Sequence, residues 1–271
     1  MEQTVQKALN LLEALVRSGQ PRRLTELSRE LGLTKPNVYR LLSTLSVLGY
    51  VKKDPLTSLY SPTLKLWEMG SMLVRDVDLV SAAGPRLRKL CNDAHESVQL
   101  AVFDNGFVVY VDKVDSAQPL KAITSIGSRV PASVTSTGKA ILAWAGDEAL
   151  DQAVEHVKRY TPVTLVRRKD IEHDLEETRA RGYSINRGEF RQGVCGIAVP
   201  IRDRSGTVVA AVGVWGAEKN ILGSRRDELA YLTMAAARDI SQQLGYIETA
   251  ATGGASPQRD PAARAPTLVK A

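Results

Sequence analysis

The sequence lacks the long apolar stretches and the cysteine patterns that mark several common protein classes. It has no run of 18 consecutive apolar residues, which a membrane-spanning helix requires. Its two cysteines, Cys91 and Cys195, form neither a metal-binding spacing nor a disulfide framework. The first residues, MEQTVQKALNLLEALV, have the pattern of an amphipathic helix rather than of a signal peptide. We therefore expect a cytoplasmic protein with no membrane partner, no metal site and no cofactor.

Motifs of catalysis are also missing. The three histidines, His95, His156 and His173, are scattered, and none has a second ligand at zinc spacing. STGKA is similar to the end of a phosphate-binding loop, but Ser133 stands where that loop needs a glycine, five residues before Gly138. No Gly-x-Ser-x-Gly elbow occurs, and the second cysteine lies in an apolar stretch typical of a buried, unreactive thiol. We predict no catalytic residues, although an enzyme built on the C-terminal part of the chain stays an alternative.

Positive charge is concentrated near the N-terminus. The 271 residues have a formal net charge of +6, with 36 Lys and Arg against 30 Asp and Glu. Residues 1–60 contain nine of these basic residues and five of the acids, so the first fifth of the chain carries most of the excess. Such a bias fits a polyanionic partner such as DNA, and it fits a solvated basic face equally well.

Three short helices are predicted in this basic part. QKALNLLEALVRSG has an apolar stripe that includes Leu11, Leu15 and Val16, and LTELSRELG has a second one, with Thr25 as a possible N-cap. In the stretch 33–53, LTKPNVYRLLSTLSVLGYVKK, four apolar residues fall on one face of a third helix. Thr34 can cap that helix, and its first turn tolerates the following proline because an N–H is not needed there. Three helices with a tight glycine turn before the third predict a helix-turn-helix.

The opposite face of the third helix is polar, as expected of a recognition helix whose N-terminal side chains reach base edges in the major groove. Arg40 can read guanine and Asn37 adenine, while Lys52 and Lys53 lie on a predicted β-hairpin wing that can follow the phosphate backbone. The alternative is a small three-helix bundle used for protein contacts. The predicted DNA-binding residues are Thr25, Thr34, Lys35, Pro36, Asn37, Tyr39, Arg40, Ser43, Thr44, Lys52 and Lys53.

The rest of the chain is predicted to be α+β, with an antiparallel sheet flanked by helices. Residues 1–62 form the winged helix-turn-helix, and 63–78 a linker helix that packs between protomers or domains or else closes the first domain. A break is expected at Gly84-Pro85. Residues 79–249 contain β-rich runs, including a hairpin at Asp104-Asn105-Gly106 and a strand at 120–127, and a closing helix at about 224–245. Residues 250–271, rich in Ala, Gly and Pro, are predicted to be a disordered tail.

Five motifs occur in order over about residues 3–248: TELSRELGL, YRLLSTL, GYV, VPASVTSTGKAILA and RGYSINRGEFRQGVCGIAVPIRDRSGTVVAAVGVWG. Together they resemble the IclR family of bacterial transcription regulators. The resemblance implies a winged helix-turn-helix, a linker helix and a GAF-like domain that binds a small-molecule effector. It also implies homodimers, often dimers of dimers, on palindromic double-stranded operators.

The resemblance further implies an effector site. Its residues map to Ala122, Val130, Ser136, Thr137, Asn186, Val194, Gly196, Gly213 and Trp215. Members similar to small-keto-acid sensors have an acidic residue, a cysteine and two serines at four of these positions, where this chain has Asn186, Gly196, Gly213 and Trp215. We therefore expect a larger effector, which is an aromatic or partly apolar organic acid or a related amide. Backbone N–H groups near Ser136 and Thr137, at the start of a predicted helix, can bind its acidic group. The alternative is that Trp215 belongs to the core.

Overall fold

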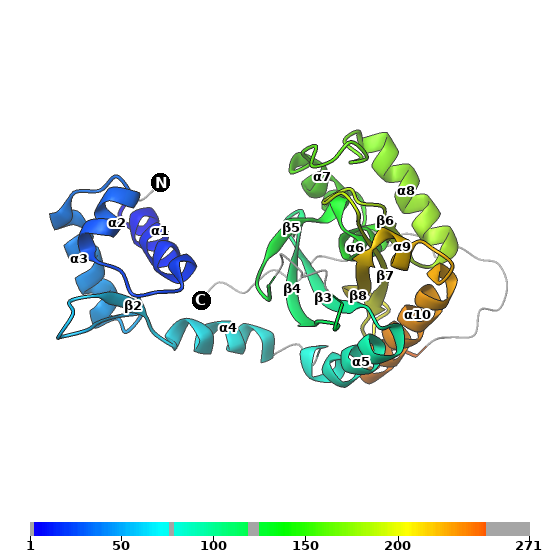
Figure 1. The fold of residues 1–271 in the computed structure, drawn as a ribbon, viewed down its shortest axis with the longest axis horizontal. Helices are drawn as coiled ribbons and strands as arrows, with labels where there is room; N and C mark the ends of the chain where they lie inside the picture. The colour runs from blue at the N-terminus through cyan, green and yellow to red at the C-terminus, as the bar shows by residue number, and fades with distance from the viewer. Residues whose placement is uncertain (1–2, 76–78, 119–124, 248–271) are drawn as a thin grey trace. The chain divides into compact units, whose positions relative to one another are not determined.

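The computed structural model describes residues 3–75, 79–118 and 125–247, except for the side chains of 71–75 (Figure 1). The chain divides into two compact units, Met1–Val80 and Ser81–Ala271. The predicted tail, Ala122 and most of the strand predicted at 120–127 lie outside the described residues. None of the described helices is long and apolar enough to cross a membrane.

The first unit contains the predicted three helices and hairpin. Its elements are α1 (Gln3–Ser18), α2 (Leu24–Glu30), α3 (Lys35–Val47), β1 (Val51–Lys53), β2 (Tyr60–Pro62) and α4 (Lys65–Arg75). Leu11, Leu15, Leu27 and Leu42 are fully buried where the three helices meet. Val16 was expected on the same stripe, but it is half exposed because it lies about 100° further around α1 than Leu15.

The second unit is built on a six-stranded sheet in which every pairing is antiparallel, in the order β5-β4-β3-β8-β7-β6. The strands are β3 (Ser97–Asp104), β4 (Phe107–Val114), β5 (Arg129–Pro131), β6 (Ser184–Asn186), β7 (Val194–Arg202) and β8 (Val208–Ala217). The turn between β3 and β4 has Asn105 at φ 46° and Gly106 at φ 83°. Positive φ at both central residues matches the strand twist, so the predicted hairpin is confirmed.

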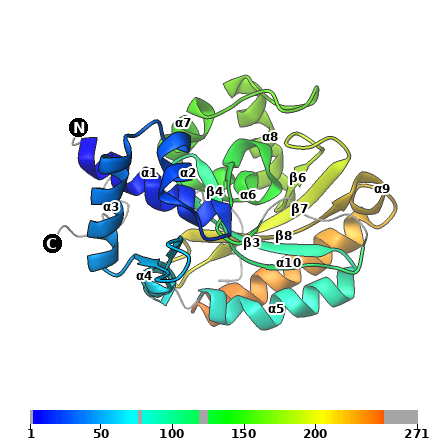
Figure 2. The same ribbon diagram turned by 60° about the vertical axis from the view of Figure 1, so that its left-hand side comes forward.

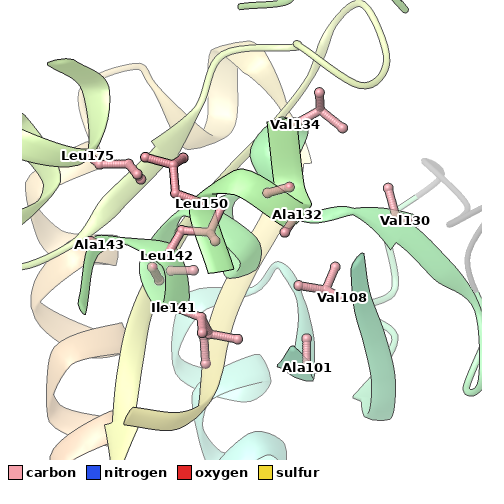
Figure 3. Packing of buried hydrophobic residues seen from close by; sticks show 14 of the residues in the cluster. Ala101, Val108, Val130, Ala132, Val134, Ile141, Leu142, Ala143, Leu150 and Leu175 are labelled. Atoms are coloured by element: carbon pink, nitrogen blue, oxygen red, sulfur yellow. The ribbon is translucent and has the colours of Figure 1, made fainter. Parts of the chain in front are cut away.

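Helices cover both faces of the sheet (Figure 2). They are α5 (Leu79–Ala94), η1 (Ala132–Val134), α6 (Ser136–Ala145), α7 (Asp147–Glu155), α8 (Arg168–Arg181), α9 (Glu218–Ile221) and α10 (Arg226–Gln243). The α6 helix packs on one face, and α5 and α10 lie side by side on the other (Figures 1 and 2). Figure 3 shows the core on the α6 side, which includes Ala101 and Val108 from the sheet and Ile141 and Leu142 from α6.

The break predicted at Gly84-Pro85 is wrong, because α5 continues through both residues. A proline inside a helix costs about 3 kcal/mol. Leu79, Ala83, Leu87 and other apolar residues of α5 are buried on both sides of it, and this burial outweighs the local cost.

Candidate nucleic-acid interface and effector site

The outer face of α3 is exposed and polar. Lys35, Pro36, Tyr39, Arg40 and Thr44 are exposed, because the buried residues of α3 all lie on its opposite face. Asn37 and Ser43 are half-buried at the edge of this face. The structure therefore brings seven of the predicted DNA-binding side chains together on one helix.

The start of α3 is suited to binding a phosphate. Thr34 occupies the N-cap position with extended backbone, as predicted, although its side chain makes no capping hydrogen bond. The first intrahelical bond runs from the Val38 N–H to the Thr34 carbonyl, at 3.0 Å. The N–H groups of Lys35 and Asn37 precede that bond and point out of the helix end, where anions bind readily.

The predicted N-cap role of Thr25 is wrong, since Thr25 is the second residue of α2 and Arg23 occupies the cap position. Glu26 explains the difference: its carboxylate accepts the Arg23 N–H at 3.2 Å, which fixes the start of the helix without a threonine. Thr25 is nevertheless exposed.

Acidic side chains in the first unit are engaged away from α3. The Arg22 guanidinium donates to Glu26 and to Glu30, at 2.9 Å each, and Arg17 pairs with Glu13 at 2.8 Å. Among the described residues, no ion pair involves Lys35 or Arg40. Glu13, Glu26 and Glu30 therefore neutralise arginines outside α3 and leave its positive charge available.

The wing extends this basic surface. Lys52 and Lys53 are exposed on β1, and the Lys53 ammonium lies 5.8 Å from the centre of the Tyr60 ring. Tyr60 also exchanges two backbone hydrogen bonds with Arg22, at 2.9 and 2.8 Å, so the hairpin is attached to the segment before α2. The wing is thus fixed to the same unit that presents α3.

In the second unit, strand register aligns three of the predicted effector residues. Asn186, Gly196 and Trp215 are direct neighbours across β6, β7 and β8. Gly213, two residues before Trp215, lies on the same face, and the N-terminus of α6 covers this face. A Cβ atom added to Gly196 would lie 2.7 Å from Ser136 Oγ, so a larger residue here would require the Ser136 side chain to move.

These residues are buried, and several are already bonded. Ser136, Thr137, Asn186 and Trp215 are each at most 9% exposed. The amide of Asn186 donates to the Val134 carbonyl and accepts the Gly188 N–H, so it is a structural contact in this state. Val130 is buried on β5, and Val194 is half-buried at the start of β7.

Sequence reasoning missed polar groups near Thr137. Burial raises the pKa of Tyr110 to about 12, and the nearby Thr137 hydroxyl opposes part of that increase. Thr137 Oγ1 itself makes no hydrogen bond of normal geometry to any described residue. Gln99 lies opposite Gly213 in the pairing of β3 with β8. The buried atoms Gln99 Oε1 and Ser133 Oγ have no hydrogen-bond partner among the described residues. The only available signal was β-strand alternation, which places Gln99 on the face of Ala101.

The start of α6 offers further donors. The Thr135 side chain caps the helix by accepting the Gly138 N–H at 3.0 Å, and the first intrahelical bond runs from the Lys139 N–H to the Thr135 carbonyl. The N–H groups of Ser136 and Thr137 precede that bond. They can meet the carboxylate of a small molecule.

A buried cation lies one turn further along α6. Lys139 is 1% exposed, and its ammonium lies 2.5 Å from Glu189 Oε1 and 3.0 Å from Asp174 Oδ2. Arg187, half exposed, lies 3.6 Å from the other Asp174 oxygen. Because two carboxylates neutralise Lys139, it is not free to bind an acidic ligand.

Two other features lie apart from these residues. An open hollow lined by Ala217, Glu218, Lys219, Leu222 and Gly223 lies at α9, and none of the predicted effector residues lines it. Cys195 is 1% exposed, and burial raises the pKa of its thiol to about 11. The prediction that this thiol is buried is confirmed, and the raised pKa disfavours the thiolate, which is the nucleophilic form.

Comparison with known proteins identifies both units. The family profile "IclR helix-turn-helix domain" matches residues 4–55, and "Bacterial transcriptional regulator IclR C-terminal" matches residues 71–242. The chain is 35% identical to the HTH-type transcriptional regulator KdgR of Escherichia coli K12 over 247 residues, covering 90% of this chain and 93% of KdgR. It is 30% identical to XynR of the same organism, covering 93% of this chain and 97% of XynR. The crystal structure of Thermotoga maritima IclR matches with a TM-score of 0.77 at 28% identity, over 91% of this chain and all of that one.

Proposed function

The chain belongs to the IclR family of bacterial transcriptional regulators, and from that membership we propose how it acts. As a member, it is a DNA-binding regulator of transcription and not an enzyme. We propose that α3 and the β1–β2 wing bind a palindromic operator in the cytoplasm. A small molecule bound by the second unit then changes the affinity for that operator.

One observation carries the DNA-binding part of the proposal. Lys35 and Arg40 are exposed at the start of α3, while the nearby acids are paired with Arg17 and Arg22. A guanidinium free of protein carboxylates can form two hydrogen bonds to a guanine, and an ammonium can bind phosphate. Lys52 and Lys53 on the wing add sequence-independent affinity.

The proposed domain organisation follows the two units. Residues 1–62 bind DNA, residues 63–78 are a linker that contains α4, and residues 79–249 bind the effector. The protein acts as a homodimer or a dimer of dimers, because a palindrome presents two half-sites to two recognition helices.

The effector changes how the second units associate, and the linker helices transmit that change to the spacing of the α3 helices. A coupling free energy of about 1–3 kcal/mol corresponds to roughly a 5- to 150-fold change in operator affinity.

The effector proposed is an aromatic or partly apolar organic acid or a related amide. Trp215 and Val130 provide apolar surface, and the N–H groups of Ser136 and Thr137 provide donors for a carboxylate. Gln99 Oε1 and the Thr137 hydroxyl have no hydrogen-bond partner in the described part of the chain. Because buried polar atoms are almost always hydrogen-bonded, they support an effector that also carries a polar substituent.

Two experiments test the proposal separately. Purified protein is used to select binding sites from a random duplex library, and enrichment of a palindromic motif is expected. No enrichment over unselected DNA would contradict the operator proposal.

For the effector, a thermal-shift screen of aromatic and aliphatic acids and their amides is expected to yield compounds that raise the melting temperature, because a ligand of the native state stabilises it. A response to short keto acids alone contradicts the proposed effector class.

A further inference from the structure

The tip of the wing, residues 54–59, carries an apolar side chain that no described residue covers. Leu56 is 93% exposed, the highest value for any large apolar side chain among the described residues. It lies between β1, which bears Lys52 and Lys53, and β2. Isolated exposed apolar residues are common, so exposure alone identifies no function.

The backbone of the wing tip is held rigidly. Asp54 Oδ1 accepts hydrogen bonds from the Leu56 N–H at 2.9 Å, from the Thr57 N–H at 2.7 Å and from the Thr57 hydroxyl at 2.9 Å. The Asp54 carbonyl accepts the Ser58 N–H, and the Asp54 N–H donates to Leu59. Pro55 fixes a further backbone angle. The backbone at Leu56 is therefore fixed before binding, and little backbone entropy is lost when Leu56 makes a contact.

The wing tip also contains a strained residue. Ser58 has φ 57°, a left-handed conformation that a non-glycine residue adopts at some energetic cost. A flexible glycine turn would close the hairpin without this cost. Strain of this kind occurs where surrounding structure enforces a particular geometry, often at a functional site.

We propose that Leu56 is an apolar wedge that enters the minor groove of operator DNA and unstacks a base step. This inference rests on the proposed DNA-binding function and assigns a new residue to it. Minor-groove proteins insert leucine and similar side chains between base pairs and kink the duplex by roughly 20–90°. The lysines at the base of the hairpin neutralise the phosphates that flank the groove. Because pyrimidine–purine steps unstack most easily, Leu56 favours operators with such a step beneath the wing.

The test uses the full-length protein and the operator recovered by selection. Leu56→Ala is compared with wild type for affinity by fluorescence anisotropy and for DNA bending by energy transfer between dyes at the duplex ends. Leu56→Ala should bind about tenfold more weakly, since a leucine side chain loses its burial. It should also reduce the bend and leave the salt dependence of affinity unchanged.

Two further variants make the result specific. The pair Lys52→Gln and Lys53→Gln should reduce the slope of log affinity against log salt by about 1–2, which Leu56→Ala should not do. Val47→Ala, which changes another exposed apolar side chain of the same unit, should leave the bend unchanged. Unchanged affinity and bending in Leu56→Ala overturn the wedge. If wild-type protein selects no DNA sequence at all, the proposed function itself fails.

Discussion

The ammonium of Lys139 lies 3.0 Å from Asp174 Oδ2, so a buried ion pair joins α6 to α8. Glu189 completes the group at 2.5 Å and connects it to the segment between β6 and β7. The Thr161 and Thr164 hydroxyls in turn donate to the Gly188 and Glu189 carbonyls. One buried charged cluster therefore holds together α6, which bears Ser136, α8, and the segment that follows Asn186.

Removing Lys139 should destabilise the second unit strongly. In Lys139→Met two buried carboxylates lose their cation, a change that typically costs about 3–5 kcal/mol. The free energy of unfolding is measured by urea denaturation, followed by the fluorescence of Trp144 and Trp215 in a Trp67→Phe background. The matched control is Lys89→Met, which removes an exposed partner of Asp93 and should have little effect.

The same measurement separates charge from packing. The triple variant Lys139→Met, Asp174→Asn and Glu189→Gln removes all three charges and should recover part of the lost stability. If Lys139→Met were as stable as Lys89→Met, the cluster would not hold these elements together.

Replacing Trp215 should change the choice of effector. Trp215→Ser removes a buried indole beside Gly196 and creates space next to a new hydroxyl. Smaller and more polar acids should then raise the melting temperature more, and aromatic acids less, than they do in wild type. The control is Trp144→Phe, at the far end of α6 from Ser136. An unchanged ligand profile in Trp215→Ser would mean that Trp215 is only core.

Glu96 should make stability depend on pH. It is 2% exposed, its Oε1 accepts from Asn220 at 2.8 Å, and burial raises the pKa of its carboxyl above the ordinary 4.5, with Asn220, Arg225 and His95 opposing the shift. The folded protein therefore binds this proton more tightly than the unfolded chain does. Its contribution to the free energy of unfolding is largest below pH 4.5 and is lost as pH rises through the raised pKa.

Glu96→Gln tests this sign, because it keeps the acceptor for Asn220 and removes the charge. The variant should be more stable than wild type at pH 8, with a flatter stability profile above pH 4.5, measured by urea denaturation across pH. A variant less stable than wild type at pH 8 would mean that Arg225 stabilises the carboxylate more than burial destabilises it.

Local patterns in the sequence predicted most of the described elements and the exposed face of α3. The 3.6-residue spacing of Val38, Leu41, Leu42 and Leu45 predicts which face of α3 is buried, and therefore which side chains are exposed. Asn105-Gly106 predicts the hairpin because few residue pairs adopt its backbone angles. Both features depend on neighbours in the chain.

Features that depend on distant contacts could not be predicted in this way. Lys139 meets a carboxylate 50 residues away, and nothing in the local pattern distinguishes it from a surface lysine. Pro85 remains inside α5 because of tertiary packing. The N-cap of α2 is a local exception: Arg23 occupies it instead of Thr25, and the nearby Glu26 carboxylate accepts the Arg23 N–H. The effector residues were assigned by resemblance, and how they pack became visible only with the strand register of β6, β7 and β8.

The central claim is that α3 reads operator DNA through Arg40, and one measurement tests it most directly. Wild type and Arg40→Ala are titrated by gel retardation against the selected operator and against a duplex of the same composition in scrambled order. Wild type should prefer the operator, and Arg40→Ala should lose that preference, by about 1–3 kcal/mol for each half-site contact, while both proteins keep similar weak affinity for the scrambled duplex. An Arg40→Ala protein that still prefers the operator as strongly as wild type contradicts the account.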